Sequence, residues 1–207
     1  MRGLFVIFTV CACLGAAQLQ AAGDAAAGKA AYALCATCHG PAGAGMQTMN
    51  GPQLAGQEAW YLERQIKAFK DGVRGGDPKD VFGMQMRPMA MTLPSDEAID
   101  NVVAYIRTFT PTNSPSTLSG DAAKGKALYA LCGTCHGAKG EGMAAMNGPA
   151  LAAQNDWYLV TQLKNYKSGA RGTDASDMYG MQMRPMAMTL ADDQAILDVV
   201  AYIKSLE

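Results

Sequence analysis

The chain is a tandem duplication. Residues 23–110 align without a gap onto residues 120–207 at a constant offset of 97 residues, and about 55 of the 88 aligned positions are identical. Solenoid repeats are about 20 to 50 residues long, so a repeat of this length indicates two copies of a whole domain. Each copy is near the lower size limit for a stable core, so we expect a cofactor to stabilise each domain.

Nine residues separate the two copies. Residues 111–119 read PTNSPSTLS, and their prolines and hydroxyl side chains favour neither a helix nor a packed strand. We therefore predict a first domain over 23–110, a linker over 111–119 and a second domain over 120–207.

The first 22 residues have a different composition. Arg2 precedes an apolar run over 4–14, and small residues follow at 21 and 22. This pattern predicts a signal peptide over 1–22 and a periplasmic protein. A helix that spans a membrane needs about 20 apolar residues, and this run is shorter. Residues 10–13 loosely resemble a lipoprotein cleavage box, so a lipid anchor at Cys13, with peripheral membrane association, is the alternative.

Within each copy, apolar residues recur at helical spacing. We expect a first helix that starts at Asp24 and runs into Cys35, a second over 58–70 with its twin over 156–167, and a third after Ser95. The apolar face of the third helix consists of Ile99, Val102, Val103 and Ile106. The segment between the second and third helices is rich in Gly, Pro and Met and shows no strand-like alternation. The sequence predicts an all-α fold with long loops.

Each copy carries one C-x-x-C-H motif, the attachment signature of c-type haem. The motif residues are Cys35, Cys38 and His39, and Cys132, Cys135 and His136. Two cysteines three positions apart share one helix face, so both can form thioethers with the haem vinyl groups while the next imidazole faces the iron. The alternatives are a redox dithiol or half of a zinc site, but a zinc site would need two such pairs around one metal, and each copy carries one pair. The motifs predict two covalently bound haems c.

The sixth iron ligand is limited by composition. The chain has only these two histidines, and no cysteine remains outside the signal segment, so methionine, lysine or an open position remains. The chain has 14 methionines, and the block MQMRPMAMTL occurs at 84–93 and again at 181–190. We interpret the block as a loop that holds one ligand, with its other methionines filling gaps in the core.

With these motifs the chain resembles a class I cytochrome c in duplicate, close to the dihaem cytochrome c4 family. The resemblance covers the whole mature sequence. It includes a helix crossing of small and aromatic residues, namely Gly28 and Tyr32 against Tyr105, and Gly125 and Tyr129 against Tyr202. It implies that the carbonyl groups of Pro52 and Pro149 accept the proximal imidazole N–H. It also implies two haems whose propionate edges face each other.

The resemblance further implies an axial methionine seven residues before the leucine that opens the last helix. Counting back from Leu93 and Leu190 gives Met86 and Met183 as iron ligands, beside His39 and His136. The block also contains other methionines, and the next candidates are Met89 and Met186.

Other residues have two readings each. Two aromatic pairs, Trp60 with Tyr61 and Trp157 with Tyr158, either line the haem crevice or donate to a propionate, or else pack in the core. Arg74 and Arg171 either neutralise haem propionates or are solvated loop charges. We also expect Gly43 and Gly45, like Gly140 and Gly142, to let the chain pass close to the porphyrin.

Together these features predict an electron-transfer protein without catalytic residues, and not an enzyme. The formal net charge of −1 provides no basic surface for nucleic acid. A dihaem peroxidase or thiosulfate dehydrogenase needs an open iron or a Cys or His sixth ligand, and the chain has neither residue to spare. We expect a respiratory or dehydrogenase donor, a bc-type complex among the partners, and a terminal acceptor such as an oxidase. The alternative is a cytochrome subunit of a larger oxidoreductase complex.

Because both motifs are intact, the purified mature protein should carry two covalent haems. A pyridine haemochrome assay combined with a protein determination measures this ratio. One haem per chain would contradict the assignment of two sites.

Overall fold

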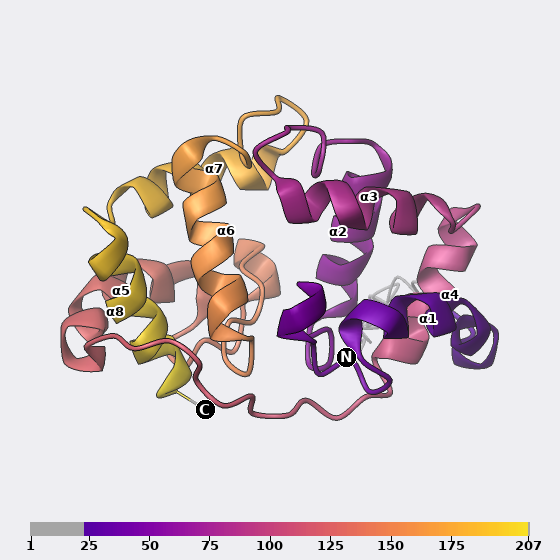
Figure 1. Cartoon of the computed structure of the whole chain (residues 1–207), viewed down its shortest axis with the longest axis horizontal. Helices are drawn as coiled ribbons and strands as arrows, with labels where there is room; N and C mark the ends of the chain where they lie inside the picture. The colour runs from indigo at the N-terminus through magenta and orange to yellow at the C-terminus, as the bar shows by residue number, and fades with distance from the viewer. Residues whose placement is uncertain (1–22, 207) are drawn as a thin grey trace, which may run out of the picture.

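The computed structural model describes residues 23–206, which form two helical domains lying side by side (Figure 1). The first domain contains α1 (Ala25–His39), α2 (Ala59–Lys70), α3 (Val81–Met91) and α4 (Asp96–Ile106); the second contains α5 (Ala122–His136), α6 (Asp156–Ser168), α7 (Met178–Met188) and α8 (Asp193–Lys204). Each domain also has one short 3-10 helix, η1 (Gln47–Met49) or η2 (Ala144–Met146). No strand occurs within 23–206, so the all-α class is confirmed. The predicted signal peptide, with Cys13, lies outside the described residues.

Asp24 caps the first helix, as predicted. Its carboxylate accepts hydrogen bonds from the backbone N–H groups of Ala26 and Ala27, at 2.8 and 3.2 Å, which satisfies donors that lack a partner within the helix. The helix contains the whole C-x-x-C-H motif and stops at Gly40, whose φ of +79° is readily adopted only by glycine. The motif histidine, His39, is therefore the last residue of α1.

The first and last helices of each domain cross at a glycine. A Cβ atom at Gly28 would lie 1.9 Å from the carbonyl oxygen of Asn101, and Gly125 is equally crowded in the second domain. Beside this contact, Tyr32 packs edge-on against Tyr105 with ring centroids 5.5 Å apart. The predicted helix crossing is confirmed, and the absence of a side chain at the glycine is what permits it.

The core of each domain forms along its last helix. The apolar face predicted for that helix is buried in both copies, as Ile99, Val102, Val103 and Ile106, and as Ile196, Val199, Val200 and Ile203. In the first domain, Leu62, Ile66 and Phe69 of α2 pack against this face. The second helix thus covers the core and also lies next to the other domain (Figure 1).

The repeated methionine block is helical, so our interpretation of it as a loop is wrong. Its first copy lies mainly in α3 and its second copy in α7. Asp80 caps α3 by accepting a hydrogen bond from the N–H of Gly83, and Pro88 lies inside the helix. Capping by Asp80 and packing of α3 against α2 outweigh the local cost of glycine and proline in the helix.

The segment between the domains runs along one side of the molecule (Figure 1). Residues 111–119 contain no helix or strand. The Asp156 carboxylate accepts hydrogen bonds from the N–H and hydroxyl of Thr117, and the amide of Asn155 donates to the Ser114 hydroxyl at 2.9 Å. The segment is therefore bound to the start of α6.

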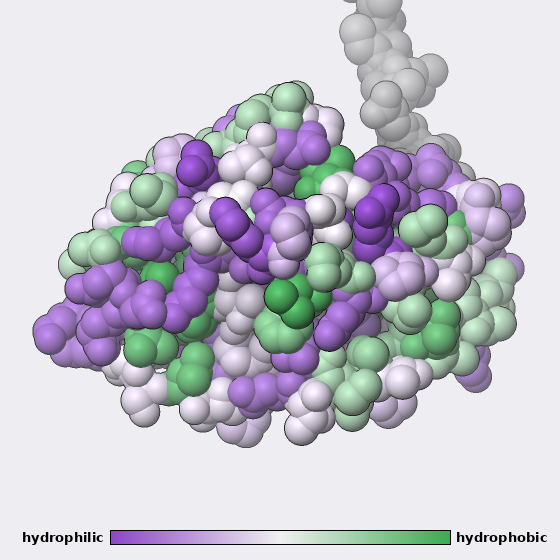
Figure 2. All heavy atoms as spheres, turned by 45° about the horizontal axis from the view of Figure 1, so that its top comes forward, coloured by the Kyte–Doolittle hydropathy of each residue, from purple (hydrophilic) through white to green (hydrophobic). Residues whose placement is uncertain are grey.

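On the face shown in Figure 2, hydrophobic residues form small groups among polar ones. Exposed hydrophobic side chains include several methionines of the repeated blocks, namely Met84, Met91, Met181 and Met188. In the part of the chain that the structure describes, no helix has the length and apolar character needed to cross a membrane.

The crossing glycines can be tested in α5. Gly125→Ala should destabilise the second domain by about 1 to 3 kcal/mol, because the new Cβ would meet the carbonyl group of Asp198. Chemical unfolding of the holoprotein, followed by the circular dichroism of its helices, measures the loss.

Gly133→Ala is the matched control in the same helix. The nearest atom to its new Cβ belongs to the Tyr129 side chain, at 3.3 Å, and the first copy already carries Ala36 at this position. It should leave stability unchanged or raise it by up to about 1 kcal/mol through helix propensity. Equal losses in the two variants would contradict a specific role for the crossing.

Candidate functional site

A cavity of about 400 Å³ extends across both domains and is lined by both C-x-x-C-H motifs. Its lining includes Cys35, Cys38, His39, Cys132, Cys135 and His136. None of the four cysteines forms a disulfide within 23–206, and all four are half-buried; burial raises the pKa of the Cys35 and Cys132 thiols. Most of the remaining wall is apolar and includes core residues such as Leu62 and Ile66. The structure thus brings the motif residues of both copies to one continuous cavity.

A backbone carbonyl orients each motif histidine. The Nδ1 atom of His39 lies 2.7 Å from the carbonyl oxygen of Pro52, and that of His136 lies 2.8 Å from the oxygen of Pro149. A carbonyl oxygen can only accept, so Nδ1 carries the proton and Nε2 keeps its lone pair. The geometry agrees with the role that the family resemblance implied for both prolines.

The surroundings of both imidazoles favour the neutral form. Burial lowers the pKa of His39 and of His136, and the hydrogen bond to the proline carbonyl opposes this only in part. The nearby carboxylate of Glu58, a residue of the first domain, raises the pKa of His136. A neutral imidazole with a free Nε2 is the form that binds a metal.

Two methionines of each block line the cavity. They are Met86 and Met89 in the first domain, and Met183 and Met186 in the second. Met86 is half-buried and packs against the first core. Met183 is half-buried, whereas Met186 is 38% exposed. The other methionines of the two blocks do not line the cavity and are exposed.

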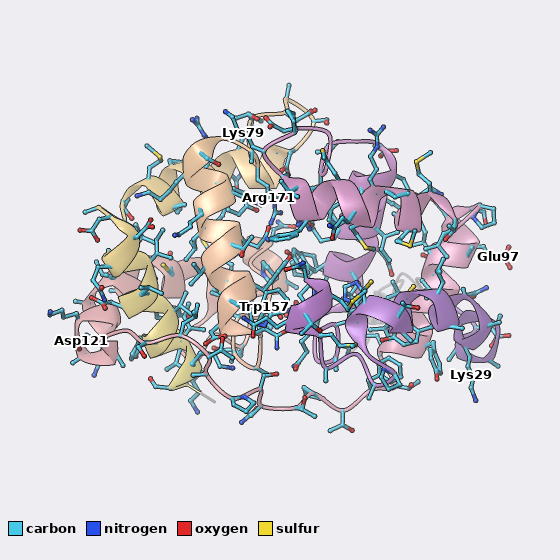
Figure 3. The ribbon with its side chains drawn as sticks, in the orientation of Figure 1. Lys29, Lys79, Glu97, Asp121, Trp157 and Arg171 are labelled. Atoms are coloured by element: carbon cyan, nitrogen blue, oxygen red, sulfur yellow. The ribbon has the colours of Figure 1, made fainter. Side chains whose placement is uncertain are left out.

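Two buried arginines connect the domains through a pair of glutamines. Arg74 donates from Nη1 to Gln65 Oε1 at 2.8 Å and from Nη2 to Gln162 Oε1 at 3.3 Å. Arg171 makes the reciprocal pair, at 2.8 Å to Gln162 and 3.3 Å to Gln65. Figure 3 shows Arg171 on the side of the second domain that faces the first. Two units related by an approximate twofold axis make reciprocal contacts of this kind.

These arginines are incompletely satisfied by the described residues. Arg74 and Arg171 are only 4% and 5% exposed, their Nε atoms lack a hydrogen-bond partner within 23–206, and neither forms an ion pair there. A buried cation without an anion is costly. Two haem propionates would supply both charge and acceptors, so thiols, imidazoles, thioethers and guanidinium groups together fit one haem in each domain.

The two tryptophans and the loop glycines differ in whether they line the cavity. Trp157 lines the cavity, whereas Trp60 does not, and the indole N–H of Trp60 is buried without a partner in 23–206. None of Gly43, Gly45, Gly140 and Gly142 lines the cavity either. Gly45 and Gly142 have a φ of +86°, and each makes room for a side chain from the other domain. The structure therefore does not place them beside the porphyrin, where we expected them.

The polar contacts between the domains were not predicted from the sequence. Those that cross the interface include Arg64 to Asn147, Asn165 to Asp80, Gln57 to the Ala150 carbonyl and Gln154 to the Gln53 carbonyl. One signal was available. Gln65 and Gln162 are identical polar residues on the otherwise apolar stripe of the second helix, where an unpaired amide would be unfavourable.

Comparison with known proteins agrees with this geometry. The cytochrome c family matches the chain twice, over residues 25–110 and 122–207. Cytochrome c4 of Azotobacter vinelandii is 32% identical over 199 residues, which cover 90% of this chain and 91% of the relative. A thiosulfate dehydrogenase electron acceptor of Stutzerimonas stutzeri (strain A1501) is 33% identical over 182 residues, covering 82% and 78%.

A solved structure shows the same two-domain fold. The crystal structure of reduced recombinant cytochrome c4 from Pseudomonas stutzeri matches with a TM-score of 0.70 at 30% identity, covering 90% of this chain and all of that one. The chain belongs to the cytochrome c family, as a two-domain member of the cytochrome c4 group with one covalently bound haem c in each domain.

Proposed function

We propose that this dihaem electron-transfer protein holds each iron between a histidine and a methionine. The ligands are His39 and Met86 in the first domain, and His136 and Met183 in the second. The observation that carries the proposal is the hydrogen bond from each imidazole Nδ1 to a proline carbonyl, which leaves only Nε2 for iron. Greater burial favours Met183 over Met186, and the contact of Met86 with the core supports the equivalent choice.

The haem iron supplies a one-electron Fe(III)/Fe(II) couple. His39 with Met86, and His136 with Met183, would hold the two irons with side chains of the protein, which would leave no iron position for a substrate. His39 and His136 are held by hydrogen bonds in buried sites, which limits their movement when the charge on the iron changes. A thioether ligand favours the reduced iron and raises the potential.

Arg74 and Arg171 are proposed to bind the haem propionates. Their unpartnered Nε atoms and their burial beside the shared cavity support this role. Because both guanidinium groups also contact both glutamines, the propionate edges of the two haems would meet at the domain interface. This arrangement favours rapid electron exchange within one molecule.

We place the protein in the periplasm, exported by a signal peptide over residues 1–22. The mature chain then has domains at 23–110 and 120–207 joined by the linker at 111–119. Its redox partners are a dehydrogenase or bc-type complex as donor and a terminal oxidase as acceptor. The similarity to a thiosulfate dehydrogenase electron acceptor supports a dehydrogenase as donor.

The second candidate is a cytochrome subunit that stays bound to a larger oxidoreductase. The same similarity favours it, because that relative is named for its dehydrogenase. Size-exclusion chromatography of a native periplasmic extract distinguishes the two. A free carrier elutes near the mass of a single chain, whereas a subunit elutes with its complex.

The carrier function predicts two reversible one-electron steps for each chain in a spectroelectrochemical titration. It also predicts no turnover of hydrogen peroxide or thiosulfate by the isolated protein, since both irons have two protein ligands. Catalytic turnover of either compound would show an accessible iron and would refute the proposal.

The ligand assignment predicts different results for two neighbouring methionines. Met86→Ala should open only the first iron, remove about half of the sulfur-to-iron charge-transfer band of the oxidised protein and lower the potential of that haem. Met89→Ala should keep the whole band and lower only the stability, because it shortens a half-buried side chain. Loss of the band in Met89→Ala with retention in Met86→Ala would move both assignments, to Met89 and Met186.

A further inference from the structure

In the first domain, the peptide group between Pro52 and Gln53 makes a hydrogen bond at both its carbonyl and its N–H. The carbonyl of Pro52 accepts the His39 Nδ1–H at 2.7 Å. The N–H of the same peptide group, which belongs to Gln53, donates to Asn155 Oδ1 of the second domain at 2.7 Å. A hydrogen-bonded chain therefore runs from a side chain of the second domain to the imidazole of the first.

The second domain repeats this chain with a different terminal group. The Pro149 carbonyl accepts the His136 Nδ1–H at 2.8 Å, and the Ala150 N–H donates to Glu58 Oε2 of the first domain at 3.3 Å. Glu58 and Asn155 occupy equivalent positions in the duplication. The first imidazole is thus backed by a neutral amide, and the second by a carboxylate.

A glycine in each loop leaves room for these side chains. A Cβ at Gly45 would lie 2.4 Å from Asn155 Oδ1, and one at Gly142 would lie 2.3 Å from Glu58 Oε1. Glu58 and Asn155 are also the N-cap residues of α2 and α6, yet neither side chain caps its own helix. Asparagine is a favoured capping residue, so reaching across the interface replaces a local hydrogen bond in the second domain.

We propose that the Glu58 carboxylate lowers the reduction potential of the second-domain haem by polarising the peptide group that holds His136, and that neutral Asn155 exerts no such effect on the first-domain haem. Hydrogen bonds in series polarise one another, so an anion at the N–H end makes the carbonyl a stronger acceptor. A stronger acceptor makes the imidazole a more basic ligand, which favours Fe(III). Glu58 does not line the cavity and acts through the peptide group. The inference rests on the proposed function, in which His136 binds iron.

A second charge difference at the interface is separate from this chain. Arg64 stands where the second copy has Thr161. Its guanidinium donates to Asn147 Oδ1 at 2.7 Å and lies over the Tyr179 ring, 4.0 Å from the centroid. It makes no hydrogen bond to the peptide behind His136 and is unchanged in the variants below.

Glu58→Gln removes the charge and keeps an oxygen that can accept from the Ala150 N–H. The second-domain haem should become easier to reduce, by on the order of tenfold in its Fe(III)/Fe(II) equilibrium constant, which corresponds to about 59 mV. The first-domain haem should not change. A redox titration of the holoprotein followed by NMR resolves the two haems, because their methyl signals can be assigned through contacts with residues of each domain.

Asn155→Asp is the converse variant, since it places a carboxylate of the same size on the Gln53 N–H. It should lower the potential of the first-domain haem and leave that of the second unchanged. Retention of the sulfur-to-iron band in both variants shows that ligation is intact.

Glu58→Gln with both potentials unchanged, both shifted equally, or the second lowered would overturn the inference. Such results in a protein that still shows two one-electron steps would leave the carrier function intact. Absence of two such steps in the unsubstituted protein would instead refute the proposed function itself.

Discussion

The hydrogen bond between each motif imidazole and a proline carbonyl links the parts of a domain that matter for its chemistry. It sets which ring nitrogen carries the proton, and it ties the end of the motif helix to the loop that follows. The peptide group that contains the carbonyl also receives a side chain from the other domain. The motif imidazole, the loop and the domain interface therefore share one peptide group, and a change at any of them reaches the other two.

Much of the fold was predictable because its determinants are local. A capping Asp24, a crossing glycine at Gly28 and an apolar stripe on the last helix can each be recognised within a short window of sequence. The methionine block was assigned wrongly because Gly83 and Pro88 suggest a loop. Its helix depends on the cap at Asp80 and on packing against α2, and the packing becomes apparent only in three dimensions.

The site was predictable only in part, because half of it forms between the domains. Motif spacing identified the cysteines and histidines, but Arg74 meets Gln162 from 88 positions away in the chain. Where the two copies keep the same residues, the contacts are reciprocal. Where they differ, as at Glu58 and Asn155, the two haem environments become unequal. A pattern within one copy cannot show which residue it will face in the other.

The linker has a consequence for how the two halves associate. The reciprocal arginine–glutamine contacts form a self-complementary patch, the kind that builds symmetric dimers from identical subunits. Covalent joining replaces a bimolecular encounter with an intramolecular one, for which short linkers give effective concentrations of about millimolar. The contact between the two domains then does not depend on the concentration of the protein. The two redox centres therefore keep their relative position even when only a few copies of the protein are present.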